Sequence, residues 1–369
     1  RRKIAKVWET HHDLDRSLEA YEAAEASCEG DPEALAPELG REWVRILLGR
    51  AYVYYWQGKP DAAREVIDRV APHVETLGEP IDRYGYYHQL VNWQFREHRY
   101  RVSSQTLLHC RLALQAAQGA GALPEMAFAR FMLGFALLFK GDLVEAEAAL
   151  HNALEASRRI GDAVGETRAA SYLALTLRRA RRADDARRAA NDALALAKAR
   201  QMRDYIGLAY GVQAWVAYEA GYLGEAEKLG AAARESWDGL PFPHPFRWNG
   251  ELVRLALTLE GLHGDGELEG ALESARELTK ETQLQLPDPI DAPLVAAVEL
   301  SEVDGALAVG AAGHRGEILE LLQQALVAAK KLDYLVDLVG ELVIVQAQIS
   351  QLATERHDSV LSGLSENLE

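Results

Sequence analysis

Small side chains recur at a fixed spacing along this chain, within segments whose apolar and polar positions follow a helical pattern. Gly134, Ala174 and Ala214 lie 40 residues apart, and Gln94 lies 40 residues before Gly134. No run alternates apolar and polar residues for long enough to predict a strand. A constant period in the range of about 20 to 50 residues is typical of solenoids made of stacked repeats. The pattern therefore predicts an all-α repeat protein and not a single globular core.

Each clear repeat has the same internal spacing. Gly141 follows Gly134 as the turn, Ala146 lies in the second helix, and Ala153-Leu154 closes the repeat. The next two repeats place Ala174, Arg181, Ala186 and Ala193-Leu194, and then Ala214, Gly221, Ala226 and Ala233, in the same order. Antiparallel helices joined by a short turn approach closely only where neither carries a long side chain. Glycine at the turn allows a positive φ, and we expect Asp142 to cap the following helix.

Weaker copies of the pattern extend the array on both sides. Their anchoring positions are Ala5, Ala51 and Gln94 before the three clear repeats, and Ala256 and Ala306 after them. We expect one solenoid of about eight antiparallel hairpins over 1–369. It comprises a worn first repeat (1–30), the best-defined repeats (41–240), repeats with longer proline-containing loops (241–333), a closing helix (334–352) and a polar tail (353–369).

The motif of a small residue, a Gly-Asp turn, a second small residue and an Ala-Leu pair resembles that of the tetratricopeptide repeat (TPR) family. The family repeat has about 34 residues, so these repeats resemble members with lengthened helices. They are similar to the long-helix TPR arms that follow a nucleotide-binding module in bacterial signalling ATPases and regulators, some of them joined to class III cyclases. The resemblance implies a right-handed superhelix, and a C-terminal sensor role beside an NTPase domain outside this chain.

Two proline-rich segments interrupt the helical pattern, at 240–246 and at 286–293. Proline lacks an amide donor and disfavours helix in the residue before it. We therefore expect the chain to leave the helical stack at both segments.

The charge balance excludes a general nucleic-acid binder. The net charge is −16 and the pI about 5.2, whereas phosphate neutralisation needs clustered lysine and arginine. The fifth repeat nevertheless concentrates Arg178, Arg179, Arg181, Arg182, Arg187 and Arg188. These side chains form either a solvated surface balanced by Asp184 and Asp185, or an anion site or contact for an acidic neighbouring domain.

The two cysteines and the hydropathy bear on the compartment. Cys28 and Cys110 are too few and too widely separated for a disulfide framework, which favours a reducing cytoplasm. No apolar stretch of about 18 residues predicts a membrane span. The chain begins at Arg1 without a methionine, which is compatible with a piece of a longer polypeptide.

Sequence motifs for catalysis and for cofactors are absent. There is no G-x-x-x-x-G-K-[ST] phosphate loop, no H-E-x-x-H, no G-x-S-x-G and no zinc-spaced set of Cys and His. The glycines within 264–270 do not have the spacing of a dinucleotide fingerprint. We therefore predict a protein that is not an enzyme and that carries no cofactor and no metal.

Aromatic and polar side chains gather where the TPR resemblance places the inner curve. In the family, the inward positions of the first helix lie one, four and five residues after the anchoring small residue, and two and six before it. The resulting candidate ligand-binding residues are Tyr52, Tyr55, Trp56, His88, Asn92, Phe95, His98, Arg99, Phe128, Met132, Arg168, Tyr172, Arg178, Arg179, Trp215 and Tyr218. Such a composition is typical of a binding hot spot. The alternative is packing between hairpins, which we expect above all for Phe135 and Phe139.

Two functions fit these observations. The first is a recognition or sensor arm that binds a peptide, a protein segment or a small effector on its concave face. The second is a scaffold for self-association through the last helix, because Val336, Leu338, Val339, Leu342, Val343, Val345 and Ile349 make that helix apolar on more than one side. The end of a solenoid is expected to be polar outside.

Overall fold

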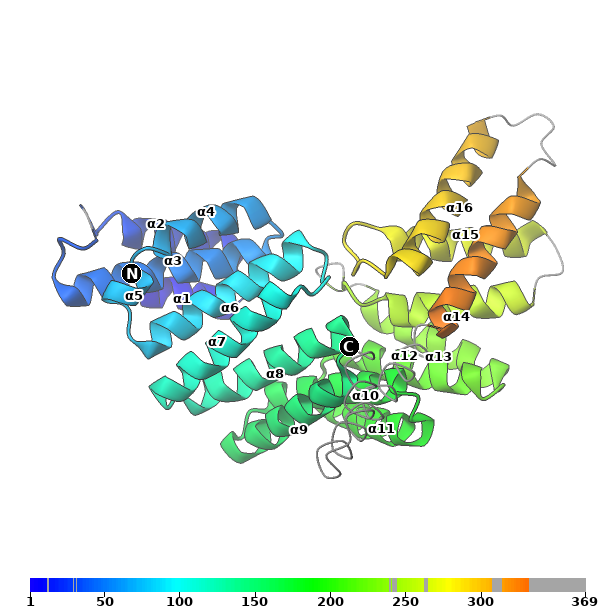
Figure 1. Ribbon diagram of the computed structural model, residues 1–369, viewed down its shortest axis with the longest axis horizontal. Coiled ribbons are helices and arrows are strands. Elements are labelled where there is room, and N and C mark those ends of the chain that lie inside the picture. Colours follow the sequence, from blue (N-terminus) through cyan, green and yellow to red (C-terminus); the bar gives the residue numbers. More distant parts are fainter. Residues whose placement is uncertain are drawn as a thin grey trace, which may run out of the picture. The chain divides into compact units, whose positions relative to one another are not determined.

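The described part of the chain is built from helices that pack against their neighbours in the sequence. In this computed structural model, the structure describes residues 1–11, 13–28, 30, 32–238, 240, 244–261, 265–306 and 314–331. Consecutive helices run back and forth as hairpins, and contacts such as α1 with α2, α6 with α7 and α8 with α9 join them (Figure 1). No strand occurs among the described residues. The predicted all-α hairpin fold is confirmed.

The chain forms two compact bodies. The first body comprises Arg1–Leu173, Asp192–Tyr205 and Glu281–Gln285. Its complete helices are α1 (Arg2–Thr10), α2 (Leu14–Glu25), α3 (Pro37–Trp56), α4 (Pro60–Val70), α5 (Val74–Leu77), α6 (Pro80–Glu97), α7 (Ser104–Ala120), α8 (Leu123–Lys140) and α9 (Leu143–Ile160). Three helices contribute residues to both bodies: α10 (Ala163–Arg179), α11 (Ala183–Ala199) and α12 (Arg203–Glu219).

The second body comprises Ala174–Asn191, Ile206–Lys280 and the residues from Leu286 onward. Its complete helices are α13 (Leu223–Trp237), α14 (Trp248–Glu260), α15 (Asp265–Thr279) and α16 (Asp288–Ala306), and residues 315–331 are also helical. The predicted closing helix over 334–352 and the tail over 353–369 lie outside the described residues.

The anchoring small residues of the predicted repeats are buried at helix contacts. Ala5, Ala51, Gln94, Gly134, Ala174, Ala214 and Ala256 are all buried. At Gly134 a Cβ atom would lie 2.7 Å from Cγ of Leu150, so the α8 backbone approaches α9 too closely for any larger residue. Gln94 fills the same position in the third repeat, where its Oε1 lies 3.0 Å from Nδ1 of His109 on α7. A polar contact there replaces the close approach of two backbones.

The predicted turn positions adopt the left-handed backbone conformation in four repeats. Gly58, Gly141, Arg181 and Gly221 have φ of 67°, 103°, 54° and 79°. In the third repeat the left-handed residues are Arg99 and Tyr100 instead of the predicted Arg101. The predicted turn residues of the first, seventh and eighth repeats, His12, His263-Gly264 and Gly313, lie outside the described residues.

Three local features differ from the expectation. Asp142 is the N-cap residue of α9, but its side chain forms no capping hydrogen bond. The short helix α5 was not predicted, because four residues carry too little periodic pattern. The second proline segment does not lie entirely outside helix: α16 begins at Asp288 and contains Pro289 and Pro293. Pro289 lies in the first helical turn, where amides have no partner within the helix, whereas Pro293 lies inside the helix.

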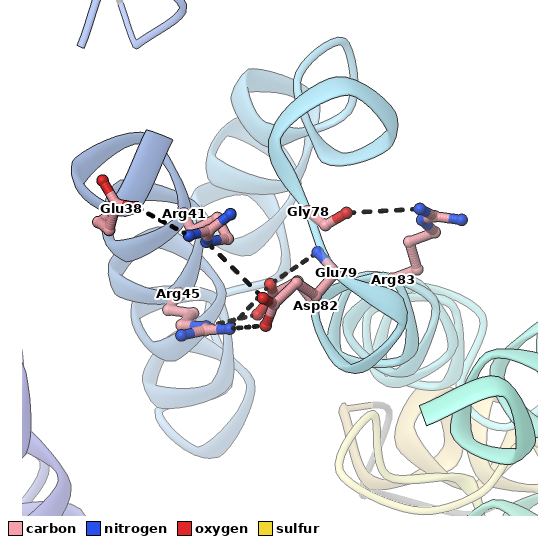
Figure 2. Close-up of polar contacts among 7 residues, drawn as sticks. All are labelled: Glu38, Arg41, Arg45, Gly78, Glu79, Asp82 and Arg83. Atoms are coloured by element: carbon pink, nitrogen blue, oxygen red, sulfur yellow. Dashed lines mark hydrogen bonds and ion pairs between the residues drawn. The ribbon is translucent and has the colours of Figure 1, made fainter. Parts of the chain in front are cut away.

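An ionic contact fixes the start of α6 against α3 (Figure 2). Arg45 of α3 donates from Nε to Oδ1 of Asp82 at 2.6 Å and from Nη2 to Oδ2 at 3.1 Å. Asp82 also accepts from the backbone nitrogen of Glu79 at 3.0 Å, which completes a capping box at the N-terminus of α6. These contacts set the position of α6 relative to α3, and both helices carry candidate binding residues.

Candidate functional site

One side chain from each of six helices joins a continuous row in the first body. We call these side chains the inner row: Lys6 of α1, Tyr52 of α3, His88 of α6, Phe128 of α8, Arg168 of α10 and Tyr205 of α12. Each of these helices is the first helix of a predicted repeat. The row therefore lies on the surface that the repeat pattern assigns to the inner curve.

The members of the inner row contact one another in order. Nζ of Lys6 lies 5.3 Å from the ring centre of Tyr52, and the rings of Tyr52 and His88 are 6.5 Å apart. The ring of His88 meets that of Phe128 edge-on at 5.1 Å. The guanidinium of Arg168 lies 5.0 Å from the ring of Phe128. These contacts combine aromatic surface with two cations, and the row itself contains no acidic residue.

Arg168 is half-buried and interacts mainly with aromatic side chains. Its guanidinium lies over the rings of Phe128 and Phe131, at 5.0 and 5.3 Å, and its Nε donates to Oη of Tyr205 at 3.1 Å. Burial works to lower the pKa of Arg168, but the oxygens of Tyr205 and Tyr52 outweigh it, so the pKa is raised. The guanidinium therefore stays charged. Among the described residues, no carboxylate forms an ion pair with it.

His88 is a neutral member of the row. Burial, together with the nearby cations Lys6 and Arg168, lowers its pKa from 6.5 to about 4. Nδ2 of Asn92 lies 3.2 Å from Nε2 of His88 and donates to Oε1 of Gln89 at 3.3 Å. Asn92 thus holds the imidazole from within α6. At neutral pH the site offers a polar but uncharged ring between the two cations.

A second set of aromatic rings packs behind the row. Phe135 contacts Phe95 at 5.2 Å and Tyr172 at 4.9 Å, and Tyr172 lies 6.5 Å from Tyr205. Phe95, Phe135 and Tyr172 are buried, with at most one twentieth of their surface exposed. Their rings join α6, α8 and α10 in the manner of a core. The expectation that Phe135 packs between hairpins agrees with this placement.

The sixteen predicted site residues divide by exposure. Tyr52, Tyr55, Trp56, His88, Arg99, Phe128 and Arg168 are half-buried, and His98 is exposed. Asn92, Phe95, Met132, Tyr172, Arg178, Arg179, Trp215 and Tyr218 are buried. Four of the half-buried residues, Tyr52, His88, Phe128 and Arg168, meet in the inner row. Tyr55 and Trp56 adjoin it, because Trp56 contacts both Tyr55 and Tyr52.

Arg99 lies away from the inner row. Its Nε donates to the backbone oxygen of Gln283 at 3.1 Å, and its own carbonyl accepts from the backbone nitrogen of Gln285 at 2.9 Å. Arg99 therefore holds the segment Glu281–Gln285 within the first body. This is a structural contact between residues far apart in the sequence, and the repeat pattern contains no signal for it.

Predicted site residues in the second body form their own packed contacts. The guanidinium of Arg178 lies 5.3 Å from the ring of Trp215 and 5.2 Å from that of Trp248. Oη of Tyr218 donates to a carboxylate oxygen of Glu260, and Lys330 Nζ lies 4.8 Å from the Tyr218 ring. Because Arg178, Trp215 and Tyr218 are buried, their contacts are those of a core.

The sequence reasoning missed two members of the inner row. Lys6 directly follows Ala5, so the same positional pattern applied to the worn first repeat selects it. Tyr205 lies nine residues before Ala214, three residues before the earliest position considered. A spacing of three keeps it on the same helical face. Both residues thus had a signal in the sequence.

Two features are not found in the described part of the chain. No three side chains of His, Cys, Asp or Glu come together as ligands for a metal ion. None of the described helices is both long enough and apolar enough to span a bilayer.

Comparisons with known proteins concern the fold and the C-terminal segment. The family model "Signal transducing histidine kinase, homodimeric domain" matches residues 326–369. The structure is similar to a Rap protein complexed with Competence and Sporulation Factor, with a TM-score of 0.62 and 14% identity over 100% of this chain and 96% of that chain. It is also similar to the apo form of RapI, with a TM-score of 0.57 and 11% identity over 99% and 95% of the two chains.

A third similar structure is a Signal Transduction ATPase with Numerous Domains (STAND) protein with a tetratricopeptide repeat sensor, from Pyrococcus horikoshii. Its TM-score is 0.53 at 14% identity, and the match covers 82% of this chain and 43% of that protein. This chain thus spans less than half the length of the STAND protein. The sequence matches no curated protein. The structural similarities support a TPR-like helical repeat fold, and at identities this low they concern the fold alone.

Proposed function

We propose that this chain is a non-catalytic recognition domain that binds a peptide or protein segment along the inner row of the first body. The observation that carries the proposal is the half-buried guanidinium of Arg168, set among aromatic rings without a carboxylate partner among the described residues. Aromatic rings provide contact area at low entropic cost, and a desolvated cation beside them strengthens polar recognition.

The placement of the row on the first helices of successive repeats supports an extended ligand. Six successive first helices each contribute one side chain, so a segment laid along the row would contact several repeats at once. One solved Rap protein of similar fold is complexed with Competence and Sporulation Factor. A bound partner on this kind of fold therefore has a precedent.

We further propose that the chain is the sensor region of a larger signalling ATPase. The similar STAND protein joins a tetratricopeptide repeat sensor to an ATPase within one polypeptide. A ligand that prefers one arrangement of the repeats shifts its population by the difference in affinity between the two arrangements. Binding on the inner row would then change the state of an attached nucleotide switch.

Affinity selection of pooled synthetic octapeptides tests the binding proposal. We expect the purified chain to enrich defined sequences, and Phe128→Ala to weaken their binding about 10-fold, because it removes a ring at the centre of the row. The matched control is Val144→Ala on α9, whose side chain is 78% exposed and lies outside the row. If no sequence is enriched, or if Phe128→Ala binds enriched peptides as well as the wild type, the inner row is not the binding site.

Self-association is a second candidate function, favoured by the match at the C-terminal end. The matching family model describes a homodimeric domain. The match covers residues 326–369 of this chain, which include the predicted closing helix. Light scattering of the whole chain at micromolar concentration measures this directly. A dimer that dissociates on dilution supports the scaffold role, and a monomer throughout contradicts it.

A further inference from the structure

We propose that residues Glu281–Gln285 form a latch on the first body, and that docking of this latch is coupled to ligand binding on the inner row. The latch contacts the turn of the third repeat through Arg99. This coupling rests on the proposed function and adds the regulation of the same site. It follows from the backbone of the turn, from the bonds that hold it and from a series of ring contacts.

The turn of the third repeat has an unusual backbone. Arg99 and Tyr100 have φ of 45° and 64°, whereas the turns at Gly141 and Gly221 each contain one left-handed residue, a glycine. The left-handed conformation is unfavourable for a residue with a Cβ atom, and here two bulky residues adopt it in succession. Such a conformation persists only where surrounding contacts hold it, and it is common at clamps and switches.

The latch supplies contacts that hold this turn. Nε of Arg99 donates to the carbonyl oxygen of Gln283 at 3.1 Å, and the amide of Gln285 donates to the carbonyl oxygen of Arg99 at 2.9 Å. One short segment thus holds both the side chain and the backbone of Arg99. Gln283 and Leu284 are buried, although the segment is not helical. Buried irregular backbone needs such partners for its polar groups.

The latch is a short element between two helices. Along the chain it lies between α15 and α16, and the residues on both sides of it belong to the second body. A segment of five residues opens at a lower free-energy cost than the whole body. When it opens, Arg99 loses both bonds and the strained backbone of the turn relaxes. The docked and the open latch are therefore two discrete states of the turn.

Ring contacts connect the turn with the inner row. The ring of Tyr100 stacks on Phe95 at 5.6 Å and meets Phe135 edge-on at 6.1 Å. Phe135 lies 5.8 Å from Phe131, and Phe131 lies 5.9 Å from Phe128 of the row. The four rings behind Phe128 are buried. Because buried rings are closely packed, a displaced Tyr100 shifts its neighbours.

The coupling has a defined sign. With the latch docked, the ring layer supports Phe128, which contacts both His88 and Arg168 in the row. A segment that binds the continuous row binds the docked state more tightly and therefore favours docking. By linkage, docking raises the affinity for the ligand by the same factor. Occupancy of the row is thereby passed to the chain that leads from α15 into α16.

Hydrogen exchange of the Gln285 amide tests the coupling in the wild-type chain. The probe is an octapeptide enriched by the purified chain. We expect saturating peptide to slow exchange of this amide about 5-fold or more, because it shifts the latch toward its docked state. The reference is the amide of Ala226, which donates to the carbonyl oxygen of Tyr222 in the second body and should exchange at an unchanged rate.

Removal of a latch bond tests the reciprocal effect. Gln285→Pro lacks the amide donor and should weaken peptide binding about 5- to 20-fold. Gln285→Ala is the matched control, because it keeps the donor and should bind like the wild type. Arg99→Ala removes the other bond and should also weaken binding. Its control is Arg111→Ala, an exposed arginine of α7 that pairs with Glu145 at 3.4 Å. Melting curves confirm that each variant folds.

The outcomes separate the latch from the proposed function. Unchanged or faster exchange of the Gln285 amide with peptide bound, or equal peptide binding by Gln285→Pro and Gln285→Ala, overturns the latch and leaves peptide binding intact. If no octapeptide is enriched, the proposed function fails, and the amide of Tyr100 still shows whether the latch holds the turn. This amide donates to the carbonyl oxygen of Phe95 at 2.8 Å, and Gln285→Pro should accelerate its exchange about 10-fold.

Discussion

Arg45 of α3 and Asp82 of α6 form a two-point ion pair at the N-terminus of α6, with distances of 2.6 and 3.1 Å. Asp82 is 3% exposed, and the same carboxylate caps the backbone nitrogen of Glu79. The pair links the helix that carries Tyr52 to the helix that carries His88. A side chain outside the inner row thereby fixes the spacing of two of its members.

Loss of this carboxylate should destabilise the first body. We predict that Asp82→Ala lowers the free energy of unfolding by about 3 kcal/mol, because it leaves Arg45 without its main partner and removes a cap. Asp68→Ala, which breaks the exposed i, i+4 pair with Arg64, should cost less than about 1 kcal/mol. Urea unfolding of both variants measures the difference. Equal losses would show that the buried pair has no special weight.

The repeat pattern predicted most of the fold because its determinants are local. The positions chosen for small side chains are the positions where helices touch, and four of the predicted turns have left-handed backbones. The pattern failed for α5 and for the start of α16, where short or proline-containing segments depend on neighbours and not on periodicity. It also gave no indication that Glu281–Gln285 contacts Arg99, since that contact joins distant parts of the chain.

The close contact between α8 and α9 at Gly134 should tolerate no additional atoms. We predict that Gly134→Ala lowers the free energy of unfolding by about 1 to 3 kcal/mol, because its Cβ would lie 2.7 Å from Leu150. Gly119→Ala on α7 is the control: its nearest neighbour lies at 3.8 Å, and helix propensity should stabilise it by up to about 1 kcal/mol. Thermal unfolding of the two variants should shift in opposite directions. A stabilised Gly134→Ala would contradict the packing argument.

The turn of the fifth repeat carries a residue poorly suited to its backbone. Arg181 has φ of 54°, where Gly58, Gly141 and Gly221 occupy the corresponding turns. The left-handed conformation costs a non-glycine residue about 1 to 2 kcal/mol, and glycine adds entropy to the unfolded chain. We therefore predict that Arg181→Gly raises the free energy of unfolding by up to about 1 kcal/mol in chemical denaturation. A clear loss of stability would mean that contacts of the arginine side chain outweigh the backbone term.

Acid should weaken the fold through His88. The unfolded imidazole takes up a proton near pH 6.5, whereas the folded one does so only near pH 4, so stability is lost as the pH falls between these values. From pH 7 to pH 5 this group accounts for at most about 2 kcal/mol. His88→Gln should lose correspondingly less stability over that interval in urea titrations. His244, whose pKa burial lowers to about 3, acts in the same direction and is unchanged in both proteins. Identical pH profiles would contradict a buried, neutral His88.

The candidate site was predicted in part. The positional pattern of the TPR resemblance selected Tyr52, His88, Phe128 and Arg168, which meet in the inner row. It could not distinguish them from Trp215 or Arg178, which occupy equivalent helix positions but are buried in the second body. Exposure depends on how neighbouring helices cover a side chain, and a repeat pattern does not encode that. The missing carboxylate at Arg168 likewise emerges only from three-dimensional contacts.

Photo-crosslinking tests the central claim most directly. An enriched octapeptide carrying a benzophenone side chain would be bound to the wild-type chain and irradiated, and the attached residues would be identified by mass spectrometry. The inner row as the binding site predicts crosslinks on α3, α6, α8 and α10 near Tyr52, His88, Phe128 and Arg168. Crosslinks confined to α9, to α13 or to residues 315–331 would contradict it.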